Sequence, residues 1–309
     1  MSFSSEQIEK ISKEISSKVT GKTLFDEFSR GRYSTDASVY QIKPLGVILP
    51  KDTNDVLNIM DYSQRNSIPL LARGGGSSQC GQTVGESVVL DYSKHQNKIL
   101  ELNVKDKYVW VEPGVVLDHL NEYLKPYGLW FPVDVSTSSR ATIGGMSANN
   151  SCGSRSLYYG NMVHNVLAIE AILDDGSIFT FDQIEKNYLE RKNNQDRLYK
   201  IIDKFIDVRQ KVASDIEDNW PTTQRRVGGY NIDLIDPNGF NSSNLLVGSE
   251  GTLSLFNKIK LRLSEIPKNK ILGVCYFDNF HQAMELAKEI VRLKPTLSLI
   301  HISEPTRQA

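Results

Sequence analysis

Apolar and polar positions in the first seventy residues follow two different periods. Isoleucines recur every three or four residues near the N-terminus, which predicts an amphipathic helix over 5–18. The apolar run 47–49 predicts a strand, and a helix is predicted over 53–66, where a threonine can cap its first turn. A second strand is predicted over 68–72. This part of the chain therefore predicts a β-α-β unit.

The remainder of the chain is richer in short β-forming runs bounded by turn residues. Pro113-Gly114 and Asp174-Asp175-Gly176 are turn signals, and the second predicts a hairpin. Further strands are predicted at 87–91, 99–103, 108–112, 166–173, 177–181, 245–247 and 258–263, and helices at 116–127 and 195–218. Because helices and strands are mixed without regular alternation, the predicted fold class is α+β and not a doubly wound sheet.

A glycine-rich segment follows the strand predicted at 68–72. Residues 73–81 read Arg-Gly-Gly-Gly-Ser-Ser-Gln-Cys-Gly, and a second glycine pair lies at 144–145. Consecutive glycines bring bare backbone N–H groups close to an anion and accept a positive φ without strain. A diphosphate is the expected anion, although a hairpin or Ω-loop with flexible glycines remains an alternative for this segment alone.

The common phosphate motifs are absent from this segment. It has no Gly-Lys-Ser/Thr, which argues against a P-loop nucleotide hydrolase. It also lacks the G-x-G-x-x-G spacing followed by a helix and an acidic residue, which argues against a Rossmann nicotinamide site.

Composition excludes several other classes of protein. The 309 residues carry a formal net charge of -1, with 39% hydrophobic and 24% charged residues, and no block of Lys and Arg suits a nucleic acid. No apolar run approaches the ~20 residues of a membrane span, and the N-terminus lacks a signal-peptide core. Cys80, Cys152 and Cys275 are widely spaced, which predicts reduced thiols and neither a disulfide framework nor a metal site.

Five ordered motifs together resemble one family. They are residues 73–78, 111–114, 142–146, 159–161 and 247–253. This set resembles the FAD-binding, PCMH-type domain of the FAD-linked D-2-hydroxyacid dehydrogenases, the family of D-lactate dehydrogenase and the glycolate oxidase FAD subunit. Residues 32–38 and 136–142 look most similar to large bacterial members that fuse this domain to an iron–sulfur module.

The resemblance implies a division of the chain into four parts. Residues 1–31 form an N-terminal helical segment, and 32–265 form a PCMH-type domain of two α+β subdomains with FAD extended between them. Residues 266–297 resemble the truncated start of the family's α+β cap, the C-terminal FAD-linked oxidase domain, with a strand at 271–277 and a helix at 280–293. Residues 298–309 resemble a translated sequencing adapter and are expected to be a non-native tail.

The resemblance also implies which residues bind the cofactor. Backbone N–H groups of 74–78 would cradle the pyrophosphate, while the loop 134–138 and the turn 144–145 would line its other side. Residues 248–252 would approach the adenine or the flavin edge. The expected FAD-binding residues are Arg73, Gly74, Gly75, Gly76, Ser77, Ser78, Gln79, Gln82, Pro132, Asp134, Ser136, Thr137, Thr142, Ile143, Gly144, Gly145, Ala148, Asn149, Tyr159, Gly160, Val166, Gly248, Glu250, Gly251 and Thr252.

Several of these positions also have purely structural interpretations. The glycines at 144–145 can let a helix pack closely, and 247–253 can be a strand, a turn and a strand. Tyr159 can be a packed aromatic, His164 a surface or capping residue, and Arg73 can pair with a local carboxylate. These alternatives remain open at the level of sequence.

The flavin is expected to be bound non-covalently. Related oxidases often carry a histidine in the first glycine loop that bonds to the flavin, whereas Ser77 holds that place here. Cys152 lies between small and polar residues and is expected to be a buried small residue, not a second flavin attachment.

The implied activity is oxidation of a D-2-hydroxy acid of the D-lactate, glycolate or D-2-hydroxyglutarate type to the 2-oxo acid. FAD would take the hydride from C2 while a base removes the hydroxyl proton and an arginine or lysine holds the carboxylate. Electrons would pass to a quinone, a cytochrome or an iron–sulfur module, whose clusters would lie outside this chain. The base and the carboxylate clamp are expected in the cap, so no catalytic residue is assigned.

Two other functions remain open. One is a different flavoenzyme on the same domain, such as an ether-lipid synthase or a cell-wall enolpyruvyl reductase. The other is a fragment that binds FAD without turnover, since an incomplete cap leaves an apolar face uncovered. We expect a cytoplasmic protein without a membrane span that can contact the inner face of the membrane peripherally.

Overall fold

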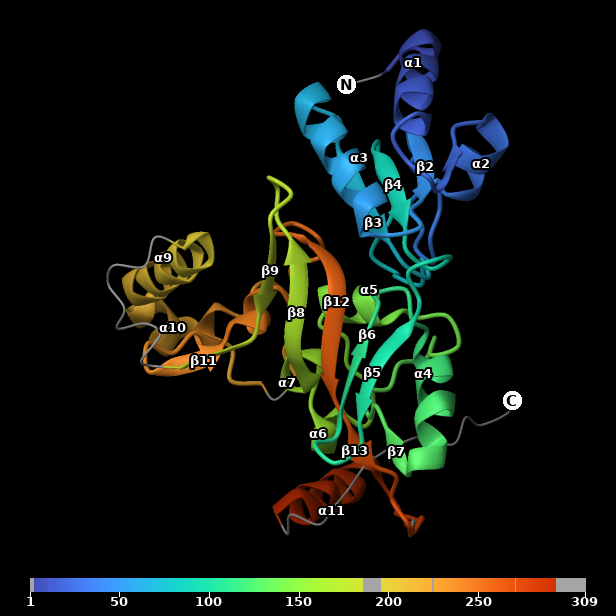
Figure 1. The fold of residues 1–309 in the computed structure, drawn as a ribbon. Coiled ribbons are helices and arrows are strands. Elements are labelled where there is room, and N and C mark those ends of the chain that lie inside the picture. The colour runs from blue at the N-terminus through green and yellow to red at the C-terminus, as the bar shows by residue number, and fades with distance from the viewer. Residues whose placement is uncertain (1–2, 186–195, 224, 270, 293–309) are drawn as a thin grey trace, which may run out of the picture.

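The computed structural model describes residues 3–185, 196–223, 225–269 and 271–292 (Figure 1). Two separate sheets with their helices form the α+β architecture that the sequence predicts, one sheet near the N-terminus and a longer one beyond it. The expected tail at 298–309 lies outside the described residues.

The N-terminal sheet is mostly parallel. Its strands lie in the order β1 (Lys22–Leu24), β2 (Gly46–Leu49), β4 (Val88–Asp91) and β3 (Leu70–Arg73). Strands β2 and β3 both run parallel to β4, whereas β1 runs antiparallel to β2 at one edge. The predicted β-α-β unit is therefore present, with β4 inserted between its two strands.

Three helices belong to this sheet: α1 (Ser5–Ser16), α2 (Glu27–Arg32) and α3 (Thr53–Asn66). A capping box between Ser4 and Gln7 begins α1. Asp52, and not the predicted threonine, caps α3, since its side chain accepts from the N–H of Asp55. The apolar faces of α1 and α3 bury residues such as Ile15 and Ile59 against β2 and β4.

The second sheet is antiparallel throughout. Its strands lie in the order β5 (Ile99–Asn103), β6 (Tyr108–Val111), β12 (Leu255–Arg262), β8 (Val166–Ile172) and β9 (Ile178–Phe181). Thus β12, the last of the five in the chain, is the central strand and pairs with both β6 and β8. A short pair, β7 (Leu129–Trp130) and β13 (Ser264–Glu265), lies at its end.

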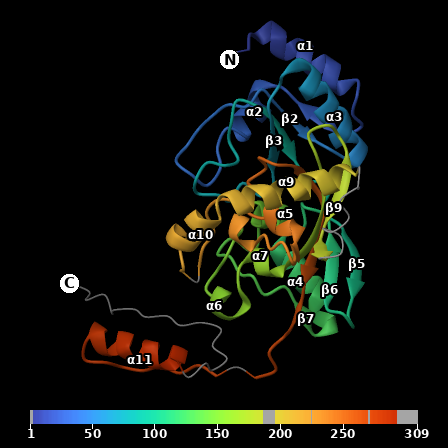
Figure 2. The same cartoon turned by 90° about the vertical axis from the view of Figure 1, so that its left-hand side faces the viewer.

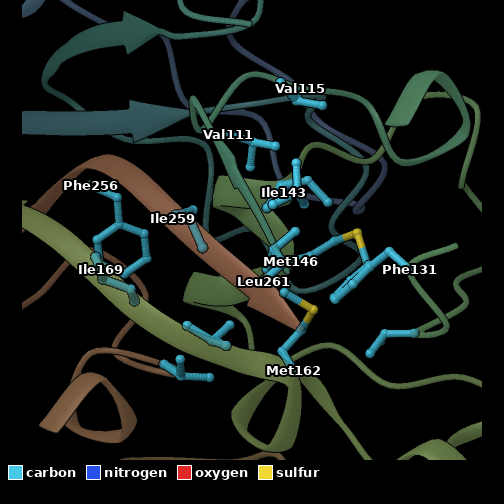
Figure 3. Packing of buried hydrophobic residues seen from close by; sticks show 14 of the residues in the cluster. Val111, Val115, Phe131, Ile143, Met146, Met162, Ile169, Phe256, Ile259 and Leu261 are labelled. Atoms are coloured by element: carbon cyan, nitrogen blue, oxygen red, sulfur yellow. The ribbon is translucent and has the colours of Figure 1, made fainter. Parts of the chain in front are cut away.

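Helices cover one face of this second sheet. They are α4 (Leu117–Leu124), the 3₁₀ turn η1 (Lys125–Tyr127), α5 (Ile143–Ala148), α6 (Ser156–Tyr159) and α7 (Met162–Asn165). Figure 3 shows Ile143 and Met146 of α5 meeting Ile259 and Leu261 of β12 in the largest core. This packing fixes α5 against the sheet.

A third, smaller core lies beside β9 (Figure 1, Figure 2). Its residues come from β10 (Gln183–Glu185), β11 (Gly239–Asn241), α9 (Arg197–Lys211), η2 (Ile232–Leu234), η3 (Ser242–Leu245) and Ile235. Helix α10 (Ala213–Asn219) follows α9 and buries none of its residues. The helix predicted at 195–218 is interrupted at Val212, whose φ of -107° is not helical, and its first residue lies outside the described part.

Two predicted strands are absent from the described residues. Residues 245–247 end a 3₁₀ turn, because the N–H groups of Leu246 and Val247 both donate to the Ser243 carbonyl. Residues 271–277 have no neighbouring strand, and side chains such as Ile271 and Tyr276 are 97% and 93% exposed. A strand requires a partner for its backbone groups, so this segment does not form one.

Helix α11 (Phe280–Arg292) follows that unpaired segment, as predicted up to the last described residue. It lies at the far end of the molecule from α1, outside both sheets (Figure 2). Across the described ranges, none of the helices combines the length and the apolar character that a bilayer span requires.

Candidate functional site

A cavity of about 720 Å³ lies where the two sheets meet. Its walls come from the β3–β4 loop, the loop 134–137, α5 with the residues that follow it, and the chain that enters β12. The volume is within the ~300–1,000 Å³ typical of ligand and cofactor pockets. The position between two subdomains suits a long ligand held along both.

The glycine loop forms one wall, and its glycines are required by close contacts. A Cβ on Gly74 would lie 2.0 Å from Thr142 Oγ1, and one on Gly75 would lie 2.2 Å from the Arg140 carbonyl oxygen. Gly76 has a φ of +63°, which glycine accepts most readily. The loop thus packs directly against the residues that lead into α5.

This loop fits a diphosphate. The backbone N–H groups of 74–78 donate to no backbone or side-chain acceptor among the described residues. Five successive free donors on the wall of a cavity are the arrangement that binds a phosphate without a cation.

Arg73 serves the loop's structure. Its guanidinium donates to the carbonyl oxygens of Tyr33, Thr35 and Thr83 over 2.8–3.2 Å and lies 5.2 Å from the Tyr33 ring. Burial lowers the pKa of Arg73, and the charge of Asp91 opposes that shift. Although Arg73 lines the cavity, its donors hold the segment 33–36 against the loop.

The opposite wall is built from α5 and the loop that precedes it. The Thr142 side chain caps α5, and a Cβ on Gly144 would lie 2.6 Å from the Cβ of Pro113. The carboxylate of Asp134 accepts from the N–H of Arg155 at 3.0 Å and from the hydroxyl of Ser154 at 2.8 Å. These bonds tie the two loops of this wall together.

Three buried polar side chains on the cavity wall have an atom without a hydrogen-bond partner among the described residues. They are the hydroxyl of Tyr92, the Nδ2 group of Asn150 and the hydroxyl of Ser254, in side chains that are 4%, 0% and 8% exposed. An unpaired buried polar atom is costly, so these groups suit a ligand with polar edges.

Most of the residues expected to bind FAD line this one cavity. They are Arg73, Gly74, Gly75, Gly76, Ser77, Ser78, Gln79, Gln82, Asp134, Ser136, Thr137, Thr142, Gly144, Gly145, Ala148, Asn149, Glu250 and Gly251. Pro132, Ile143, Tyr159, Gly160, Val166, Gly248 and Thr252 are not among its lining residues.

Two of these seven residues have packing contacts in the structure, and their place at the cofactor stays a prediction. Tyr159 packs edge-on against Trp130 at 5.4 Å and Tyr158 at 4.8 Å. Val166 begins β8 and is buried in the sheet. His164 is a capping residue, since its Nδ1 accepts from the N–H of Asn161 at 3.0 Å.

Sequence reasoning missed part of the wall. Cys152 is half-buried on the cavity and accepts a hydrogen bond from Arg225 Nε at 2.7 Å, so the expectation of a buried small residue is wrong. Tyr92 and Phe256 were also missed, because they end or begin ordinary strands and carry no motif of their own. Tyr92 and Phe256 reach the site because the tertiary fold brings segments that are distant in the sequence together.

A family model supplies the identity of the expected ligand. Residues 44–182, which contain the glycine loop and α5, match the model described as an FAD binding domain. Over these residues the chain is similar to that family. FAD is therefore the cofactor of the domain, and the free N–H donors, close glycine contacts and unpaired polar atoms of the cavity all fit it.

The chain is similar to proteins named as dehydrogenases and to one named as a glycolate oxidase subunit. The chain is 36% identical over 272 residues to D-2-hydroxyglutarate dehydrogenase of Haemophilus influenzae, covering 84% of this chain and 26% of the relative. It is 34% identical over 285 residues to the enzyme of that name from Escherichia coli, covering 89% and 28%. The chain thus spans about a quarter of the length of these relatives. Glycolate oxidase subunit GlcD of Bacillus subtilis is 28% identical over 280 residues, covering 89% and 49%.

A solved structure shares the fold. Alkyldihydroxyacetonephosphate synthase superposes with a TM-score of 0.65 at 16% identity, covering 94% of this chain and 47% of that one. At this identity the similarity establishes the PCMH-type architecture alone.

Proposed function

We propose that this chain supplies the FAD-binding part of a dehydrogenase that oxidises a D-2-hydroxy acid to the 2-oxo acid. The observation that carries the proposal is the cavity with its row of free N–H donors, in a chain 36% identical to a D-2-hydroxyglutarate dehydrogenase. Substrates of the D-2-hydroxyglutarate, D-lactate and glycolate type follow from the names of the relatives.

The residues on the cavity wall hold the cofactor in this proposal. FAD, when bound, supplies the acceptor for a hydride. The N–H groups of 74–78 hold its diphosphate, and the unpaired groups of Tyr92, Asn150 and Ser254 accept or donate to its polar edges. The packing of Gly75 against Arg140 keeps the loop close to α5.

We propose that the cofactor is held without a covalent bond. The place of the flavin-linked histidine is occupied by Ser77, and the lining residues of the described cavity include no histidine. Cys152 lines the cavity, but its sulfur is engaged with Arg225.

The rest of the reaction is proposed to involve a second domain. We propose that an FAD domain covers 32–265, with residues 1–31 packed on its N-terminal sheet through α1 and β1. Residues 266–297 would begin a cap that contains the base and the carboxylate clamp. The electron acceptor would be a quinone, a cytochrome or an iron–sulfur module. The cytoplasm is the proposed location, with peripheral contact at the inner face of the membrane when the acceptor is a quinone.

The visible spectrum of the purified chain tests this proposal. We expect the absorbance of oxidised flavin, all of it released to the supernatant by acid precipitation because the binding is non-covalent. Anaerobic addition of D-2-hydroxyglutarate or D-lactate should bleach the flavin in a protein that also contains the cap. The 309-residue chain should keep its colour.

Each result has a distinct meaning. Flavin that stays with the acid precipitate contradicts non-covalent binding. A folded, colourless chain that does not take up added FAD contradicts the cofactor site. A cap-containing protein whose flavin is bleached by none of the D-2-hydroxy acids contradicts the proposed reaction.

A further inference from the structure

A chain of polar side chains crosses the cavity wall from one subdomain to the other. Gln82, from the β3–β4 loop, donates through Nε2 to Glu250 Oε1 at 3.1 Å. Asn149, which caps the end of α5, donates through Nδ2 to the same oxygen at 3.2 Å. The two amides are in turn bonded to the hydroxyls of Ser78 and Ser151, and all five side chains line the cavity.

The carboxylate of Glu250 determines the donor and the acceptor of every hydrogen bond between these five side chains. An ionised carboxylate can only accept, so both amides turn their NH₂ groups toward Glu250. Their carbonyl oxygens then face the two serines, and Ser151 donates to Asn149 Oδ1 at 3.2 Å. Ser78 donates to Gln82 Oε1 in the same way.

Both hydroxyls therefore present lone pairs to the cavity. Each serine hydroxyl has one proton, and that proton is used on an amide. Ser78 Oγ also accepts from the N–H of Cys80 at 3.2 Å, which leaves one lone pair, whereas Ser151 keeps two. A phosphate oxygen is itself an acceptor, so neither hydroxyl can donate to the diphosphate.

The backbone holds Glu250 in place for this role. Its φ of +50° lies in the left-handed region, which is uncommon for a residue with a long side chain. The N–H of Glu250 donates to the Ala148 carbonyl at 3.0 Å, which fixes the turn to the end of α5. The side chain is thereby directed to Gln82 and Asn149.

We propose that Glu250 is a positioning residue that makes Ser78 and Ser151 hydrogen-bond acceptors, so that this part of the cavity receives the donor groups of FAD. Those donors are hydroxyls of the ribityl chain or ribose and the flavin ring N–H, while the diphosphate lies on the backbone N–H groups of the glycine loop. This inference rests on the FAD site of the proposed function and is independent of the hydroxy acid.

Titration of flavin-free protein with FAD, followed by flavin fluorescence, tests the inference. In Glu250→Gln the direction of these hydrogen bonds is no longer fixed, because an amide can donate as well as accept. The variant should bind FAD about tenfold more weakly, or ~1.4 kcal/mol. In a chain that already carries Ser78→Ala and Ser151→Ala, the same change should alter the Kd by less than twofold, since Glu250 acts through the serines. Glu122→Gln, on the exposed side of α4, is the matched control and should leave the Kd unchanged.

Binding of ADP to the same variants identifies the source of the donors. An ADP affinity that Glu250→Gln leaves unchanged assigns them to the flavin half, and a tenfold loss assigns them to the adenosine ribose. Thermal unfolding without FAD checks that each variant folds. If Glu250→Gln does not fold, Ser151→Ala alone should still weaken FAD binding severalfold.

Two results would overturn the inference. One is an unchanged FAD Kd in folded Glu250→Gln, and the other is an equal loss with and without the serines. Failure of the original chain to bind FAD contradicts the cofactor site itself, and the two failures are therefore distinguishable.

Discussion

Gly75 faces the backbone of Arg140 so closely that its missing side chain is what lets the glycine loop approach α5. The same holds for Gly74 and the hydroxyl of Thr142. At the scale of single residues, the anion cradle therefore requires that Gly74 and Gly75 have no Cβ atom. A methyl group on Gly75 must displace the backbone of Arg140, which costs more than moving the end of a flexible side chain.

Gly75→Ala should accordingly abolish or strongly weaken FAD binding. The new Cβ would lie 2.2 Å from the Arg140 carbonyl oxygen, and overpacking of this kind costs about 1–3 kcal/mol. Gly85→Ala is the control in the same loop, because its Cβ would meet no atom closer than 3.6 Å. FAD titration of both variants should separate their Kd values by at least about fivefold, and equal affinities would contradict the cradle.

His164 should make stability depend on pH. Burial and, to a smaller extent, the charge of Arg226 lower the pKa of His164 below its ordinary value of 6.5. The unfolded chain then binds a proton below about pH 6.5 that the folded chain resists, so the stability present above that pH is lost as the pH falls.

His164→Gln keeps an acceptor for the N–H of Asn161 but does not titrate. Urea unfolding at pH 7.5 and pH 5.5 should show a larger fall in the free energy of unfolding for the original chain than for the variant. Equal falls in the two chains would show that His164 does not contribute.

At the scale of elements, the sequence predicted those helices and strands whose bounds depend on neighbouring residues. Helix α3 has the predicted bounds, because its apolar spacing and its caps lie within one short segment. Residues 245–247 resemble a strand in composition but form the last residue of η3 and the turn that follows it, since distant segments decide which backbone groups are free to pair. The split at Val212 was likewise invisible in the periodicity.

The candidate site divides in the same way. Its glycine loop could be predicted because glycine repeats are a local signal for an anion cradle. Tyr92, Asn150 and Ser254 could not, because an ordinary polar residue reaches the cavity only through the tertiary fold. Tyr159 at the cofactor stays a prediction, and the structure adds its edge-on contact with Trp130, which no sequence pattern indicated.

Asp55→Asn should loosen the attachment of α3 to the N-terminal segment. The carboxylate of Asp55 is buried and accepts from the N–H groups of Thr20, Gly21 and Lys51 at 2.7, 2.9 and 2.8 Å. An amide offers one acceptor atom fewer and loses the charge, so the free energy of unfolding should fall by about 1.5–3 kcal/mol.

Asp61→Asn is the matched control on the same helix. Its side chain is half-exposed and pairs only with Arg65 among the described residues, so its effect should stay within about 0.5 kcal/mol. Chemical unfolding of both variants measures the difference, and similar values for the two would contradict the role of Asp55.

At the scale of the whole molecule, the cofactor cavity is a joint between two subdomains with separate cores. Ile172 and Leu255, from the ends of β8 and β12, pack into the N-terminal core and so link the two subdomains. A ligand that contacts both walls should therefore stabilise the molecule as a unit.

FAD should raise the free energy of unfolding by about 2.7 kcal/mol when its free concentration is 100-fold above the Kd. Thermal unfolding with and without FAD measures this as an increase in Tm. The Gly75→Ala chain should show little increase at the same FAD concentration. An equal increase in both chains would mean that FAD stabilises the protein from elsewhere.

The central place of β12 has a consequence for synthesis of the chain. On the ribosome, the β5–β6 and β8–β9 hairpins emerge well before β12, the strand that lies between them. Until β12 emerges, β6 and β8 each have one unpaired edge. Such edges are prone to pair with other chains. The sheet, and with it the part of the cavity lined by residues 254–256, is completed only after residue 262 has left the exit tunnel. The complete cofactor cavity can therefore form only once translation has passed this strand.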